Sequence, residues 1–189
     1  GGGTSEIAIL SLADIAKASS LRVAGDDFDE AIIQYLEEKR GIRVGEQTAE
    51  QIKIRIGSAW PLQEELAMKV RGRDVATGLP RQIEVNSVEV RDALADPLKK
   101  IADEVVKTLR EADPELAADL CNPELEHNGI TVAGGGALLR GIDQMLASRT
   151  GLTVKIADDP LTCVARGTAE YLENLEQYKS ILESNVEEL

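Results

Sequence analysis

The sequence is poor in the residues that build disulfide frameworks and metal sites. Among 189 residues it has two cysteines, Cys121 and Cys163, which lie far apart without CxxC spacing, and one histidine, His127. Reduced thiols are the simplest interpretation of such cysteines. Because no cluster of Cys, His or carboxylate residues accompanies it, this histidine is expected to be a solvated loop residue. These scarcities argue against a disulfide-stapled domain and predict no metal site.

Positive charge and long apolar runs are also scarce. Lys and Arg total 21 against 34 Asp and Glu, so the formal net charge is -13. An acidic chain repels phosphate backbones and anionic headgroups, which argues against sequence-independent nucleic-acid binding. No apolar run approaches the ~20 residues that span a bilayer. What remains, 43% hydrophobic and 29% charged residues, is the composition of an ordinary folded domain.

The hydrophobic pattern predicts alternating strands and helices. Ile52 and Ile56 share one helical face, and Thr48 followed by Gln51 resembles a capping box. Pro97 is expected to begin a new helix, because proline cannot donate within one. The expected elements, in chain order, are a β-hairpin over 4–23, helices over 25–41 and 46–59, strands over 66–70 and 82–86, a helix start over 87–94, a helix over 97–111, a strand over 129–133, a helix over 138–146, a strand over 152–157 and a last helix from about 161. This order indicates an α/β fold with a small inserted lobe.

Two glycine triplets are candidate ligand loops. Gly1–Gly3 precede the hairpin, and Gly134–Gly136 lie between a strand and a helix start. Without Cβ atoms, such loops let a phosphate or sugar reach the backbone N–H groups, and a helix N-terminus favours an anion. The pattern GxxxxGK[ST] is absent, and Leu139 occupies the third glycine position of the dinucleotide fingerprint. Taken alone, a triplet is more often a turn, so both interpretations stay open.

Five ordered segments carry a more specific signal: GGGTSEIAILSL, VAGDDFDEAI, GEQTAEQIKIRIGSA, ITVAGGGALLRGI and DDPLTCVARG. In this order and spacing they resemble the C-terminal half of the bacterial actin-like cell-shape proteins, the MreB/Mbl family, over essentially the entire chain. The resemblance implies an actin-like ATPase fold with ribonuclease-H-like halves, of which this chain is the second. The core nucleotide-binding subdomain would comprise residues 1–41 and 95–189, and residues 42–94 would form the inserted outer subdomain.

The resemblance also implies the residues of an ATP site. Thr4 matches a threonine associated with orienting the attacking water, and it is equally well explained as a strand-start hydroxyl. From spacing alone, Glu50 and Lys53 share one face of a helix, which also suits a surface ion pair worth roughly 0.3–0.5 kcal/mol. The implied contacts are Gly1, Gly2 and Gly3 for the β- and γ-phosphates, Gly25 and Asp26 for the ribose, Glu50, Gln51, Ile52 and Lys53 for ribose and adenine, and Gly134, Gly135, Gly136, Ala137 and Leu138 for the adenosine.

The family resemblance implies a filament protein switched by ATP, with head-to-tail self-association as its main partner interaction. Its expected role is to organise cell-wall synthesis with elongation scaffold proteins, in the cytoplasm at the inner membrane. Membrane contact and the Mg²⁺-binding carboxylates are expected in the other half. The start at Gly1 without Met is expected of a fragment, and a half-site should bind ATP poorly and hydrolyse it negligibly. The alternatives are a sugar kinase or Hsp70-type ATPase, and a truncated interaction module that does not hydrolyse ATP.

Basic residues gather on one predicted hairpin of this acidic chain. Arg71, Arg73 and Arg81 are explained either as a solvated loop or as a contact to the acidic body of the next subunit. The tail over 170–189 is rich in glutamate and predicts a helix that frays into solvent.

Overall fold

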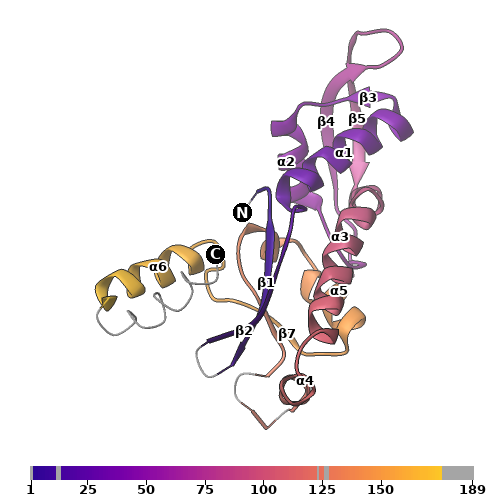
Figure 1. Cartoon of the computed structure of the whole chain (residues 1–189). Helices are drawn as coiled ribbons and strands as arrows, with labels where there is room; N and C mark the ends of the chain where they lie inside the picture. Colours follow the sequence, from indigo (N-terminus) through magenta and orange to yellow (C-terminus); the bar gives the residue numbers. More distant parts are fainter. Residues whose placement is uncertain (1, 12–13, 123, 126–127, 176–189) are drawn as a thin grey trace.

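The structure, a computed structural model, describes residues 2–11, 14–122, 124–125 and 128–175. Figure 1 shows an elongated molecule with a three-stranded sheet and two helices at one end and the N-terminal hairpin towards the other. The strands form three sheets. In the first, β1 (Ser5–Ser11) is antiparallel to β2 (Asp14–Leu21), and in the second, β3 (Ile42–Arg43), β4 (Ala67–Asp74) and β5 (Pro80–Asn86) are antiparallel in that order. In the third, β6 (Ile130–Val132) is parallel to β7 (Val154–Ile156). The hairpin prediction is confirmed, with turn residues 12–13 outside the described residues.

Helices connect most of these strands. The long helix α3 runs from the three-stranded sheet towards the hairpin, and α6 stands to one side (Figure 1). None of the helices in the described ranges is long and apolar enough to cross a membrane. The helices are α1 (Gly25–Arg40), α2 (Glu46–Ile56), α3 (Ser87–Arg110), α4 (Pro114–Leu120), the 3₁₀ helix η1 (Gly135–Leu138), α5 (Ile142–Thr150) and α6 (Cys163–Glu173).

Helix α1 forms as its sequence predicts. Phe28, Ile32 and Leu36 are buried on one face and are at most 3% exposed. The Asp27 carboxylate accepts a hydrogen bond from the Ala24 N–H (2.8 Å), which satisfies one free donor at the helix start. Gly41 ends the helix in the left-handed region (φ 62°), so the predicted stop is confirmed.

Helix α2 begins at Glu46, as the predicted range has it, and ends earlier than predicted. Gly45 is its N-cap, without a side-chain cap, and the Thr48 N–H already donates to the Gly45 carbonyl (3.0 Å). The predicted capping box of Thr48 and Gln51 is therefore wrong, because both residues lie inside the helix. The helix ends at Ile56 instead of 59, and the shared buried face of Ile52 and Ile56 is confirmed.

Helix α3 is one continuous helix, so the prediction that Pro97 begins a new one is wrong. Its N-cap is Asn86, which exchanges two 3.0 Å hydrogen bonds with Glu89 in a capping box. Pro97 is buried inside the helix and removes one backbone hydrogen bond, but the apolar stripe continues on both sides of it. That stripe consists of Val90, Leu94, Leu98, Ala102 and Val105. The helix crosses position 94, and the division into subdomains stays a prediction.

The basic hairpin is longer and more regular than predicted. Arg71 and Arg73 lie within β4 and Arg81 within β5, with only residues 75–79 between the strands. Because Gly72 pairs with Arg81, Arg81 lies on the opposite face of the sheet from Arg71 and Arg73. Its guanidinium pairs with Asp74 (2.9 Å). The expected cluster of three arginines on a loop is therefore wrong, because the period of the strand divides it.

One apolar core joins α1, α2 and α3 with the inner face of β4 and β5 and with α5. The predicted helical face over 138–146 is divided, because η1 and α5 are separate elements. Leu139, Ile142 and Leu146 are buried in the core, whereas Leu138 is 56% exposed. The predicted last helix is α6, and the tail beyond residue 175 and His127 lie outside the described residues.

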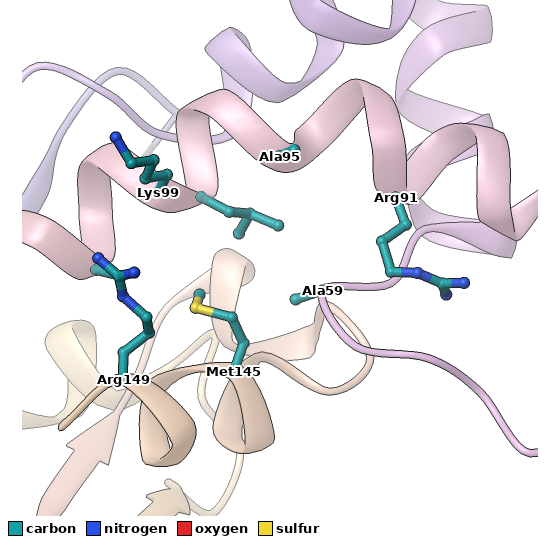
Figure 2. A pocket seen from close by; sticks show the side chains of 8 residues that line it. Ala59, Arg91, Ala95, Lys99, Met145 and Arg149 are labelled. Atoms are coloured by element: carbon teal, nitrogen blue, oxygen red, sulfur yellow. The ribbon is translucent and has the colours of Figure 1, made fainter. Parts of the chain in front are cut away.

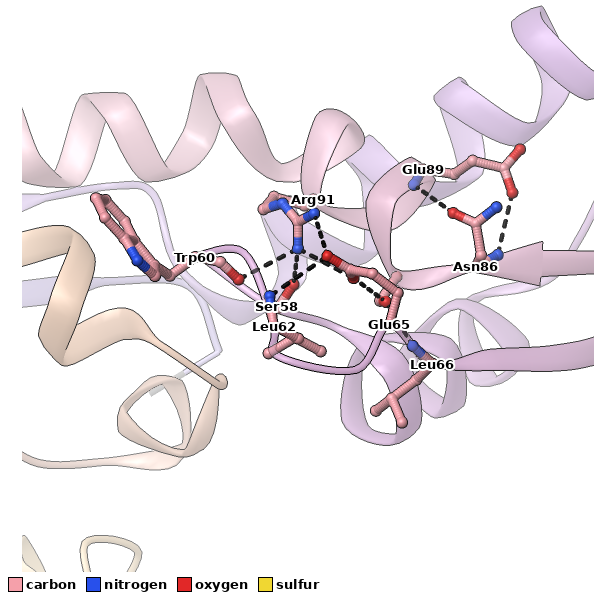
Figure 3. Close-up of polar contacts among 9 residues, drawn as sticks. Ser58, Trp60, Leu62, Glu65, Leu66, Asn86, Glu89 and Arg91 are labelled. Carbon is pink, nitrogen blue, oxygen red and sulfur yellow. Dashed lines mark hydrogen bonds and ion pairs between the residues drawn. The ribbon is translucent and has the colours of Figure 1, made fainter.

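A polar network fastens the loop after α2 to the start of α3 (Figure 3). The Arg91 guanidinium donates to Glu65 Oε1 (2.7 Å), Ser58 Oγ (2.9 Å) and the Trp60 carbonyl (3.2 Å). Ser87 Oγ donates to the second Glu65 oxygen (2.5 Å). These hydrogen bonds, first from Arg91 and then from Ser87, lower the pKa of Glu65 to about 2.

This network predicts a pH dependence of stability. The pKa of Glu65 is about 2 in the folded protein against an ordinary 4.5, so its stabilising contribution is complete above pH 4.5 and is lost as the pH falls towards 2. We expect Glu65→Gln to be less stable than wild type at neutral pH and to lose less unfolding free energy between about pH 5 and about pH 3. Urea unfolding at several pH values measures this. The neighbouring Glu64→Gln should follow the wild-type curve, and an unchanged slope in Glu65→Gln would contradict the assignment.

Candidate functional site

The first glycine loop lies against the start of α1. The Asp26 N–H donates to the Gly2 carbonyl (2.9 Å). A Cβ added to Gly2 would lie 2.6 Å from Asp26 Oδ1, so the carboxylate covers this glycine closely. Gly3 and Thr4 are exposed and lead into β1, and Gly1 lies outside the described residues. The structure thus brings the predicted phosphate loop and the predicted ribose turn together.

Lys53 of α2 joins this group from the other side. Its Nζ donates to the Gly25 carbonyl (3.0 Å) and to Asp29 Oδ2 (2.8 Å), with both charged side chains less than one fifth exposed. Asp29 Oδ1 is buried without a hydrogen-bond partner among the described residues. Burial raises the pKa of Asp29, opposed by Lys53 and reinforced by the nearby Glu50 and Asp26 carboxylates. Lys53 therefore links α2 to the start of α1 through Asp29, a contact that the sequence did not predict.

The remaining predicted residues of α2 differ in what they can offer a ligand. Glu50 and Gln51 are exposed, so their side chains are available. Ile52 is fully buried in the core, so only its backbone can face a ligand. The predicted segment is thus half core and half surface, as an amphipathic helix requires.

The second glycine loop contains one glycine that the turn requires and two that it does not. Gly134 has φ 84°, a conformation that favours glycine, and its N–H donates to the Pro160 carbonyl (2.7 Å). Gly135 and Gly136 have no positive φ; a Cβ at Gly136 would meet nothing within 4 Å, and one at Gly135 only an ordinary contact. Ala137 is buried and Leu138 exposed. The fold therefore leaves open space at Gly136, where an external group could approach the backbone.

Helix α2 also contacts the segment that follows this second loop. Arg140 Nη1 donates to the Ile54 carbonyl (3.1 Å) and the Gly57 carbonyl (3.4 Å) at the helix end. The Ala59 N–H donates to the Arg140 carbonyl (2.7 Å). Helix α2 thus contacts the Gly25 turn through Lys53 and the segment just after the second glycine loop through Arg140. Sequence reasoning did not find Arg140, although its position directly after GGGALL was a usable signal.

No metal centre is built by the residues described. Within these ranges, no three His, Cys, Asp or Glu side chains are grouped to hold a metal ion. The Asp26 carboxylate beside the first loop would repel a phosphate unless a cation lay between them. The residues present therefore do not form a complete Mg²⁺ site, and we derive no step through that ion.

A separate cavity of about 280 Å³ lies between α3 and α5 (Figure 2). Its lining is mainly apolar and includes Leu98 and Met145, while Arg91 and Arg149 at its rim pair with Glu65 and Asp103. None of the predicted ligand residues lines it. This cavity is therefore distinct from the candidate site.

Comparison with known proteins identifies the family. The family model described as MreB/Mbl protein matches residues 1–180. The chain belongs to the MreB/Mbl family. It is 46% identical over 178 residues to the cell shape-determining protein MreB of Escherichia coli K12, covering 94% of this chain and 50% of that protein. It is 41% identical over 177 residues to Mbl of Bacillus subtilis 168, covering 94% of this chain and 52% of that protein. The chain thus spans about half the length of these relatives.

Solved structures agree on the fold. MreB5 of Spiroplasma citri bound to ADP superimposes with a TM-score of 0.87 at 39% identity, covering 95% of this chain and 53% of that one. The MamK double helical filament superimposes with a TM-score of 0.69 at 22% identity over 92% of this chain and 52% of that one, which shows the fold alone. The predicted actin-like ATPase fold is confirmed. Membership of the MreB/Mbl family also decides against the sugar-kinase and Hsp70-type alternatives.

Proposed function

We propose that this chain supplies one side of an ATP site in a filament-forming protein that determines cell shape. The observation that carries the proposal is that α2 contacts the Gly25 turn through Lys53 and the segment just after the second glycine loop through Arg140. MreB5 of Spiroplasma citri has been solved bound to ADP and bound to AMPPNP. The sequence identity to this chain is 39% in the ADP structure and 38% in the AMPPNP structure. An adenine nucleotide is therefore the ligand class that suits this site best.

In the proposed complex, backbone amides of the first loop face the β- and γ-phosphates. The exposed Glu50 hydrogen-bonds a ribose hydroxyl, for which an ionised carboxylate is a strong acceptor. The open space at Gly136 receives the adenosine. Thr4, exposed at the end of the first loop, orients water for hydrolysis. Because phosphoryl transfer needs charge stabilisation from several parts at once, this chain alone is an inactive half, and Mg²⁺ enters with the other half.

The wider role that we propose is ATP-switched assembly into filaments that organise cell-wall synthesis with elongation scaffold proteins, in the cytoplasm at the inner membrane. Sedimentation of the full-length protein tests the assembly step. Filaments should pellet with ATP and remain in the supernatant after the nucleotide is removed. Equal pelleting in both conditions, together with no ATP binding, would overturn the proposal.

The outer face of β4 offers a contact for the next subunit. Arg71 and Arg73 lie exposed on this face, and within the part of the chain that the structure describes Arg73 forms no ion pair. A surplus cation on a chain of charge -13 complements the acidic body of another copy in a head-to-tail contact.

Reversal of this charge should weaken assembly. We expect Arg73→Glu to raise the critical concentration of the full-length protein by about 3- to 10-fold, since a rim charge contributes about 1 kcal/mol and its reversal adds repulsion. Light scattering against protein concentration measures this. Arg81→Glu on the opposite face is the matched comparison and should have the smaller effect. A critical concentration unchanged by Arg73→Glu would remove Arg73 from the interface.

A further inference from the structure

We propose that Arg140 is a positioning residue for the nucleotide, because it sets the separation between the Gly134–Leu138 loop and the Glu50–Lys53 turn of α2. The inference rests on the proposed function, in which these two segments lie on either side of the adenosine. Arg140 follows the loop by two residues, and its guanidinium reaches the end of α2 just beyond Lys53. It thus connects the two segments without lying in either.

The contact is chemically specific. Arg140 Nη1 donates to two carbonyls, of Ile54 at 3.1 Å and of Gly57 at 3.4 Å. Carbonyls at a helix C-terminus have no partner within the helix and carry its negative partial charge, so a guanidinium is a favourable partner for them. No other cation is recorded at these two carbonyls within the described residues. Among the described residues, the Arg140 side chain is thus a direct polar link from its segment to the last turn of α2.

The backbone around this link leaves little freedom. The Ala59 N–H donates to the Arg140 carbonyl (2.7 Å), and Ser58 and Arg140 form a parallel bridge. A Cβ at Gly57 would lie 2.3 Å from the Lys53 carbonyl oxygen and 3.0 Å from Leu139 Cδ1. Residues 57–59 are thus packed closely between α2 and the Leu139–Arg140 segment. Because close-packed elements transmit displacement, the position of the guanidinium fixes the loop relative to Glu50.

The side chain can be removed without removing the backbone links. Arg140→Gln keeps the Ala59 hydrogen bond and the bridge to Ser58, which involve main-chain atoms only. Its neutral amide ends two bonds short of the Nη1 position that donates to Ile54 and Gly57. We therefore expect the fold to persist and the two walls of the adenosine site to separate or shift. Misplacement of a positioning group by about 1 Å can cost about 100-fold in reaction rate, and the contacts that hold the adenosine depend on the same geometry.

The test uses the full-length protein and the fluorescent analogue 1,N6-etheno-ATP with Mg²⁺. We expect Arg140→Gln to raise the Kd about 10-fold and to make the bound base more accessible to acrylamide quenching, towards the value for free nucleotide. Arg140→Lys, which keeps a donor within reach of one carbonyl, should restore most of both properties. Arg149→Gln on α5, whose partner is Asp103, is the matched control and should behave as wild type.

The quenching readout separates positioning from a general loss of stability. Wild-type affinity and quenching in Arg140→Gln would overturn the inference. A second combination of results would also overturn the inference: a higher Kd, unchanged quenching of the bound base and a lower unfolding midpoint of the nucleotide-free protein. These results together would describe a residue that only stabilises the fold. A wild-type protein that does not bind etheno-ATP would instead overturn the proposed function.

Discussion

Gly136→Leu is expected to lower the ATP affinity of the full-length protein by about 100-fold or more while its thermal unfolding midpoint stays within about 2 °C of wild type. A 100-fold loss corresponds to about 2.7 kcal/mol of binding free energy. The expectation follows from the open space at this position, where an added Cβ meets nothing within 4 Å and the backbone has no positive φ. A leucine side chain therefore fits the free protein and occupies the volume that we assign to the adenosine.

Gly45→Leu is the matched control for this experiment. Gly45, at the start of α2, also has open space around its would-be Cβ and a negative φ (-88°). It belongs to neither glycine loop, so the same substitution there should leave ATP affinity unchanged. Fluorescence titration of both variants gives the comparison. Wild-type affinity in Gly136→Leu would show that the adenosine does not lie against this loop.

Gly141→Ala is expected to be the most destabilising single-methyl change that we consider, at about 2–5 kcal/mol. Gly141 has φ 73°, and its added Cβ would lie 2.5 Å from the Trp60 Cβ and 3.2 Å from the Trp60 nitrogen. A non-glycine residue in the left-handed region costs about 1–2 kcal/mol. Insertion of an atom into a packed contact costs about 1–3 kcal/mol more, because the Trp60 main chain must move.

Gly151→Ala separates these two costs. Gly151 has nearly the same backbone conformation (φ 74°), but a Cβ there meets nothing within 4 Å. It should therefore lose only the conformational part, about 1–2 kcal/mol. Urea unfolding followed by circular dichroism measures both variants. Equal losses in Gly141→Ala and Gly151→Ala would contradict the close packing of the loop after α2 on the segment before α5.

Local sequence patterns predicted the helices and strands that are specified by residues close together in the chain. The apolar spacing of Phe28, Ile32 and Leu36 and the stop at Gly41 define α1 directly. The hairpin of β1 and β2 follows likewise from short-range pattern. The prediction at Pro97 was wrong, because the packing of the whole apolar stripe of α3 outweighs the loss of one backbone hydrogen bond. The total packing energy of that stripe depends on tertiary contacts, which the residues around Pro97 do not reveal.

The candidate site was predictable as a set of loops and not as a set of contacts. The resemblance and the glycine triplets indicated residues 1–4, 25–26, 50–53 and 134–138. Among the described residues, the first two ranges meet at Gly2 and Asp26, and Lys53 contacts Gly25. Helix α2 is linked to the segment just after 134–138 through Arg140. The ion pair of Lys53 with Asp29 and the reach of Arg140 to Ile54 depend on tertiary placement. Spacing along the chain carries no information on such contacts between distant segments. For the same reason, Arg71 and Arg73 could not be separated from Arg81 until strand register was known.

The most direct measurement is a crystal structure of the full-length protein grown with a non-hydrolysable ATP analogue. Our account predicts the adenine and ribose between α2 and the Gly134–Leu138 loop, with Glu50 at a ribose hydroxyl and the phosphates at Gly2 and Gly3. A nucleotide bound to one glycine loop alone, with the other turned away from it, would contradict the account.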